Sequence, residues 1–207
     1  MILAATLNGH TFIDAFRFLW DDRSFVGQKV LEHVGLSAVS VGIAAAIALP
    51  IGVCLGHIHR GSFVAINGSN LLRALPSLAV ISIFLPALGI GHTVVVIALV
   101  VLGAPLILTN SYVAVDGVDP DIVEAARGMG LTPLQILLRV ELPLALPLIF
   151  AGVRTAAVYV VATATLAGVV GGGSLGDIIF NQPREDRSNE QEEVAFRRDR
   201  RAACVLD

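Results

Sequence analysis

At 207 residues and a formal net charge of −3, the chain has the length of one helical bundle and lacks the strongly basic charge of a nucleic-acid binder. Hydrophobic residues make up 55% of it and charged residues only 15%, against about 25% charged residues in soluble domains, and the mean hydropathy is +0.78. This composition excludes an ordinary soluble protein and predicts an all-α integral membrane protein surrounded by lipid.

The first 30 residues are predicted to form a separate external segment at the membrane surface. Phe12, Phe16, Phe18 and Trp20 alternate there with charged residues. A signal peptide is excluded, because no basic region precedes a compact apolar core with a cleavage site. We interpret the segment as an interfacial helix anchored by its aromatic side chains.

Residues 31–180 are predicted to form the transmembrane domain. A spanning helix needs about 20 apolar residues, because the hydrocarbon core is about 30 Å thick and a helix rises 1.5 Å per residue. Four runs qualify as predicted spans: 34–56, 63–88, 93–115 and 145–170. Pro76 and Pro86 interrupt the second run, which is tolerable because neighbouring helices can satisfy the freed carbonyl groups.

The few cations in the loops predict the orientation. Arg60 lies in the first short loop, and Arg127 and Arg139 lie after the third span, while residues 89–91 carry no charge. By the positive-inside rule, the Arg60 loop and the loop 116–143 are cytoplasmic and the N-terminus is outside.

The loop 116–143 is predicted to form two short helices joined by a glycine turn. Asp119-Pro120-Asp121 supplies an N-cap, a proline at the first helical position and an acid in the first turn. Gly130 is the expected left-handed residue after the first helix. Thr132-Pro133 repeats the start signal, and the second helix is expected to run until Pro143 limits it.

The first of these helices carries a surface suited to docking with a soluble partner. Ala125 and Ala126 lack bulk, so a partner can approach the backbone closely, while Ile122 and Met129 share a face that fits an apolar groove. Glu124 precedes the two alanines. The tripeptide taken alone is more typical of an alanine-rich helix without any partner.

The full pattern is more specific than the tripeptide. It resembles the permease subunits of binding-protein-dependent ABC importers, whose signature is Glu-Ala-Ala, three residues, Gly, nine residues, Ile, one residue, Leu-Pro. Here it stands as Glu124-Ala125-Ala126, Gly130, Val140 and Leu142-Pro143, with valine in place of isoleucine. The resemblance implies a polytopic bundle of the type I importer kind, in which this segment inserts into a cleft on a cytoplasmic ATPase subunit.

A second resemblance narrows the substrate class. The chain is similar to osmoprotectant permeases, which import glycine betaine, choline, carnitine or proline betaine, at 70–79 (NLLRALPSLA), 85–91 (LPALGIG), 110–112 (NSY), 118–120 (VDP) and 171–176 (GGGSLG). Methionine-type permeases share parts of this pattern and remain the alternative. An ion-coupled secondary transporter would need membrane carboxylates or paired broken helices, and an intramembrane enzyme would need a catalytic motif that the sequence lacks.

The partners and cofactors follow from what the sequence lacks and from the resemblance. The chain contains no phosphate-binding loop, and its only lysine is Lys29, so ATP and Mg²⁺ are expected on a separate ATPase subunit. No cofactor and no metal is expected on this chain, since Cys54 and Cys204 form no ligand cluster. The resemblance implies a second permease subunit, identical or paralogous, an extracytoplasmic binding protein and a place in the bacterial cell membrane.

Four polar residues within or beside the spans are candidates for a pathway or gate: Arg73, Asn110, Tyr112 and Arg154. Charged groups in lipid are unfavourable and usually face the bundle interior or a cavity. The alternative is that the two arginines stay near the cytoplasmic interface and pair with Asp116, Glu141 or lipid phosphate, and that Asn110 and Tyr112 make hydrogen bonds between helices.

The tail 181–207 departs from the family pattern. It holds six of the fourteen Lys and Arg residues and seven of the seventeen Asp and Glu residues, so no span can form there. We expect a disordered or frameshifted tail in place of the family's last span. The alternatives are a natural short variant and a truncated permease that does not transport.

Overall fold

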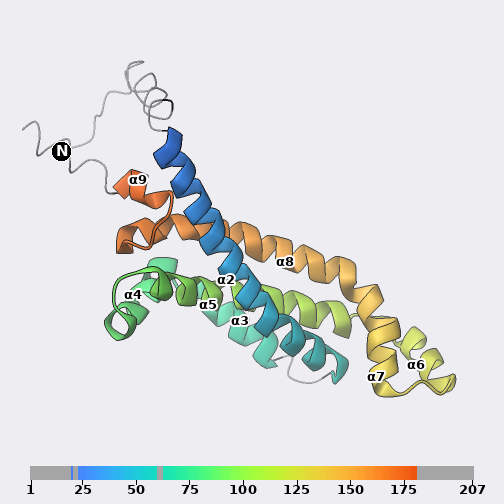
Figure 1. The fold of residues 1–207 in the computed structure, drawn as a ribbon. Helices are drawn as coiled ribbons and strands as arrows, with labels where there is room; N and C mark the ends of the chain where they lie inside the picture. The colour runs from blue at the N-terminus through green and yellow to red at the C-terminus, as the bar shows by residue number, and fades with distance from the viewer. Residues whose placement is uncertain (1–19, 21–22, 60–62, 181–207) are drawn as a thin grey trace, which may run out of the picture.

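The computed structural model describes residues 20, 23–59 and 63–180, and these residues are helical with short turns and contain no strand. Figure 1 shows long helices packed along one another, with α9 (Gly176–Phe180) at one end and α6 (Pro120–Gly128) and α7 (Pro133–Ile136) at the other. The predicted all-α class is confirmed. The tail 181–207 and most of the aromatic-rich N-terminal segment lie outside the described residues.

The first long helix, α2 (Arg23–His57), begins before the apolar run that was predicted to span 34–56. Eight residues of the expected separate segment, 23–30, therefore belong to α2. Pro50 lies inside the helix. The helix turns its small residues inward, with Ala44, Ala48, Gly52 and Gly56 all buried, as in membrane helices whose backbones approach closely.

The second apolar run is divided into three pieces rather than forming one helix. A π-helical turn, η1 (Val64–Gly68), leads into α3 (Ser69–Ala74), and α4 (Ser77–Leu88) follows a break at Pro76. Pro76 has φ −60° and ψ 131°, an extended conformation. A proline ring also disfavours the helical conformation of the residue before it, which explains the break at this position.

The remaining long elements are α5 (His92–Asp116) and a continuous helical stretch from Pro133 to Val170. The stretch consists of α7 (Pro133–Ile136), a π turn η2 (Leu137–Glu141), α8 (Leu142–Ala164) and a 3₁₀ segment η3 (Thr165–Val170). The prediction that Pro143 limits the second loop helix is wrong. Pro143 lies in the first turn of α8 directly after the π turn, where a wider helical turn accommodates its ring.

Three helical stretches within the described residues are long and apolar enough to cross a membrane: Arg23–His57, His92–Asp116 and Pro133–Val170. They form the core by packing α2, α5 and α8 on one another. One buried cluster joins Leu36, Val95, Leu99 and Val160 near one end. A second joins Ala44, Ala48, Ile107 and Ala156 near the middle. The last short helix, α9 (Gly176–Phe180), packs against η3.

Candidate functional site: the coupling loop and the bundle end beneath it

The loop at residues 116–143, which the sequence predicts to couple to an ATPase and which is called the coupling loop below, forms one end of the molecule. Its first helix is α6 (Pro120–Gly128), and Figure 1 shows α6 and α7 together at the end of the bundle opposite α9. Helix α6 packs against α7 and the π turn η2. The loop is therefore a compact unit that extends from the ends of α5 and α8.

Local hydrogen bonds define both halves of this loop. The backbone N–H of Asp121 donates to the Asp119 carboxylate at 3.0 Å, so Asp119 caps α6 as predicted. Gly130 has φ +83°, the left-handed conformation expected of it. At the start of α7, the N–H of Thr132 donates to Oε1 of Gln135 at 2.9 Å. These bonds define the starts of the two helices and the turn between them.

The outer surface of α6 carries part of the predicted signature. Glu124 and Ala125 are exposed, and Gly130 is exposed in the turn. Two large apolar side chains are exposed beside them, Ile122 at 44% and Met129 at 73%. Ala126 instead is only 2% exposed and packs inward. Of the two alanines, only Ala125 is therefore exposed where a partner could approach it.

The second half of the signature lies where the loop joins α8. Val140 is half-buried in η2, and Leu142 is half-buried at the start of α8. Leu142 packs against a buried cluster that includes Val115, Ala145 and Ile149. Pro143 is exposed. This half of the signature therefore attaches the loop to the bundle, with Pro143 as its outward-facing member.

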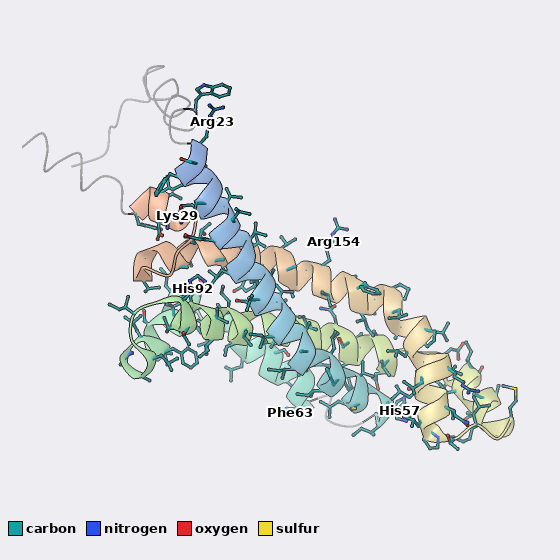
Figure 2. All side chains as sticks on the ribbon, viewed as in Figure 1. Arg23, Lys29, His57, Phe63, His92 and Arg154 are labelled. Carbon is teal, nitrogen blue, oxygen red and sulfur yellow. The ribbon has the colours of Figure 1, made fainter. Side chains whose placement is uncertain are left out.

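The buried polar contact at this junction was not anticipated from the sequence. Glu141 is 1% exposed, and its Oε2 lies 2.6 Å from Nδ1 of His57, the last residue of α2. With the Glu141 carboxylate as acceptor, the imidazole N–H donates, and the two atoms lie within hydrogen-bond distance. Figure 2 shows His57 beside the yellow helix that carries Glu141. Among the described side chains, Glu141 is thereby paired with a histidine and not with Arg154.

The π turn explains why Glu141 points inward. Along this helix the buried residues are Ile136, Glu141, Ala145 and Ile149, at intervals of five, four and four. An interval of five residues matches one π turn, whereas α-helical periodicity alone would bring residue 139 or 140 to the face of Ile136. The sequence does place an acidic residue, Glu141, between the apolar Val140 and Leu142. Only the π turn shows that its side chain faces inward.

Of the four pathway candidates, the three with described side chains are not gathered into one site. Asn110 is half-buried on α5 and its Nδ2 donates to the Leu106 carbonyl at 2.6 Å. Tyr112 is 3% exposed, one helical turn from the coupling loop. Arg73 belongs to α3, and its side chain lies outside the described part of the structure.

Arg154 occupies the face of α8 directed away from the core. It is exposed, and Figure 2 shows its side chain pointing away from the bundle. It makes no hydrogen bond or ion pair with the other residues that the structure describes. The buried residues Gly152 and Ala156 lie on the opposite face of the same helix, so Arg154 faces whatever surrounds the chain on that side.

At the other end of the bundle, an ion-pair cluster joins the start of α2 to α9. Nζ of Lys29 lies 2.9 Å from the carboxylates of both Glu32 and Asp177. A side chain at Gly173, which has φ +70°, would meet Glu32 and His92. This cluster, also missed in the sequence, attaches the glycine turn and α9 to α2.

Comparisons with known proteins agree with this architecture. A choline transport permease of Bacillus subtilis is 40% identical over 73% of this chain and 70% of its own length, and a carnitine transport permease of Listeria monocytogenes is 42% identical over 72% and 67%. An osmoprotectant import permease of Salmonella typhimurium is 32% identical over 82% and 81%.

A solved structure with a similar fold is an inward-facing form of the MetNI methionine ABC transporter. It matches with a TM-score of 0.63 and 28% identity over 73% of this chain and 76% of that chain. Residues 38–185 match the family described as the inner membrane component of binding-protein-dependent transport systems. The chain therefore belongs to the family of membrane-spanning permease subunits of binding-protein-dependent transporters.

Proposed function

We propose that this protein is the permease subunit of an ATP-driven importer of quaternary-amine osmoprotectants. Two permease subunits would form the pathway in the bacterial cell membrane, an extracytoplasmic binding protein would deliver the solute, and separate cytoplasmic ATPase subunits would bind and use ATP and Mg²⁺. The choline, carnitine and osmoprotectant permeases described above support a substrate such as glycine betaine, choline, carnitine or proline betaine.

The observation that carries the coupling role is the outer surface of α6. Ile122 and Met129 are large apolar side chains exposed at the end of the bundle, next to the exposed Glu124 and Ala125. A short helix that presents apolar residues to solvent is suited to an apolar groove on a soluble protein. We assign the role of contacting or supporting the ATPase subunit to the signature residues: Glu124, Ala125, Ala126, Gly130, Val140, Leu142 and Pro143.

The substrate class is tested with purified components in vesicles. The permease is reconstituted with its ATPase subunit and binding protein, and uptake of labelled glycine betaine, choline, carnitine and methionine is measured with and without ATP. Methionine is included because the similar solved structures belong to a methionine transporter. ATP-dependent uptake of a quaternary amine is expected, and uptake of methionine alone would reject the osmoprotectant assignment.

The coupling role is tested at Gly130. A Gly130→Val variant forces a branched side chain into the left-handed conformation, which costs roughly 1–2 kcal/mol for a residue with a Cβ atom, and changes the turn after α6. We expect ATP hydrolysis to continue while uptake falls, with membrane insertion intact. Gly128→Ala is the matched control, since nothing lies within 4 Å of a Cβ at that glycine. Undiminished uptake by Gly130→Val would count against the coupling role.

A further inference from the structure

We infer that His57 and Glu141 link the first long helix to the coupling loop, so that the cytoplasmic end of α2 moves with the loop when the ATPase acts on it. Both are positioning residues, and neither belongs to the signature positions assigned above. The inference rests on the proposed coupling role of residues 116–143 and identifies one route by which movement reaches the bundle.

The pair connects two elements that are far apart in the sequence. His57 and Glu141 are separated by 84 residues, and among the described residues their 2.6 Å contact is the one side-chain hydrogen bond or ion pair between α2 and the coupling loop. The Glu141 side chain is 2% exposed and that of His57 is 22% exposed. Water therefore competes little for the carboxylate, and a buried acceptor without a partner would be strongly unfavourable.

The surroundings of the pair leave α2 little freedom to move separately from α5. A Cβ atom at Gly56 would lie 2.8 Å from the carbonyl oxygen of Tyr112, and one at Gly52 would lie 2.7 Å from that of Leu108. Glycine allows the two backbones to approach this closely. The last turns of α2 are thus packed directly on the backbone of α5.

Behind the pair, an apolar cluster joins all three long helices. Its members are Leu49 and Val53 from α2, Ala114 and Val115 from α5, Leu137 from the π turn, and Leu142, Ala145 and Ile149 from the start of α8. Glu141 lies between Leu137 and Ala145 on the inner face of its helix. Apolar contacts hold the helices together without direction, whereas the hydrogen bond sets how α2 and the π turn are aligned.

The π turn places the pair where displacement of the loop would act on it. A docked partner would press on α6, which packs against both α7 and η2, and η2 contains Glu141. A single π turn within an α-helix is a less stable local geometry and is frequent at functional sites. Movement of α6 would therefore displace Glu141 and, through the short hydrogen bond, His57.

The decisive variant removes both polar groups together. Replacing only His57 with leucine leaves Glu141 buried without a partner, which can impair folding, but the double variant His57→Leu/Glu141→Met leaves no buried polar group unpaired. We expect the double variant to insert and assemble like the wild type, yet to import at least fivefold less substrate per ATP hydrolysed. Wild-type import per ATP in the double variant would overturn the inference.

Two single variants distinguish a specific hydrogen bond from general packing. His57→Asn retains a donor at the position of Nδ1, so we expect it to restore import per ATP to within about twofold of the wild type. His59→Asn is the matched control at the neighbouring exposed histidine, and it should leave import per ATP unchanged. If His57→Asn imports as little substrate per ATP as the double variant, the hydrogen bond is not the link.

A second measurement does not depend on transport. Spin labels are attached at Ile58→Cys and Leu138→Cys, both exposed by 54%, in a background without other cysteines, and the distance between them is measured by electron paramagnetic resonance. We expect one narrow distribution that keeps its width when ATPase and ATP are added, and a broad distribution in the double variant.

The two measurements separate the two proposals. The protein with His57 and Glu141 intact could give a narrow spin-label distance distribution and yet show no ATP-dependent import. That result would count against the proposed function and support the link between α2 and the loop. Conversely, the protein could import substrate with ATP while the spin-label distance distribution is equally broad in the wild type and in the double variant. That result would overturn the link between α2 and the loop and leave the proposed function standing.

Discussion

The close approach of α2 to α5 predicts that Gly56 tolerates no side chain. In a Gly56→Ala variant, the new Cβ would lie 2.8 Å from the carbonyl oxygen of Tyr112 and 2.8 Å from the Cβ of Val115. Carbon atoms in favourable contact are about 3.5–4.0 Å apart. Because one obstacle is backbone, it cannot turn aside as a flexible side chain would, and the two helices must separate.

The size of the effect follows from two opposing contributions. Overpacking of this kind costs about 1–3 kcal/mol, while alanine is better than glycine within a helix by up to about 1 kcal/mol. Gly42→Ala on the same helix is the matched control, since nothing lies within 4 Å of a Cβ there and only the helical gain applies. The two variants should therefore differ by about 1–3 kcal/mol in the free energy of unfolding, roughly 5- to 150-fold in the equilibrium constant.

Equilibrium unfolding provides the assay. The purified variants are titrated with sodium dodecyl sulfate in mixed micelles, and helix content is followed by circular dichroism. Gly56→Ala should unfold at a lower detergent fraction than the wild type, and Gly42→Ala at the same or a higher one. Equal unfolding curves for the two variants would refute the close packing of α2 on α5 at this glycine.

Three further predictions concern the loop, the opposite end of the bundle and the outer face of α8. Asp119→Ala removes the N-cap of α6 and should cost about 0.5–2 kcal/mol of helix stability. The backbone amides of the first turn of α6 should therefore exchange hydrogen faster. Unchanged exchange would show that the cap is dispensable. Asp177→Asn should lower the free energy of unfolding by no more than about 1 kcal/mol, because Lys29 keeps its second carboxylate, and a larger shift of the unfolding midpoint would contradict this. A charged side chain at the centre of a span costs about 2.5–3.5 kcal/mol in lipid, so the exposed Arg154 should face water. A thiol reagent that does not dissolve in lipid should therefore label Arg154→Cys and leave Ile43→Cys unlabelled, whereas equal labelling would place both in the same surroundings.

Local sequence signals predicted the coupling loop well at its start and less well at its end. Asp119 caps α6, and Gly130 adopts the left-handed conformation, because each outcome depends on bonds between residues only a few positions apart. Pro143 was expected to limit a helix and instead continues one. Its effect depends on the preceding π turn, whose position follows from packing against other helices and is not a property of the proline itself.

The sequence by itself determined the class, the family and the place of the family signature. An apolar composition leaves few ways to satisfy backbone hydrogen bonds in lipid except in helices, and the spacing of Glu124, Gly130 and Leu142 is visible without any structure. These properties depend on composition and on order along the chain, so they could be predicted directly.

Only the tertiary structure decided which of these residues meet. Ala126 faces inward while Ala125 faces outward, and Glu141 lies against His57 although 84 residues separate them. The reason is that one π turn changes which residue of the helix points inward, and that two glycines allow α2 to lie directly on α5. Such contacts arise from the packing of whole helices, which the helical periodicity of each one alone does not specify.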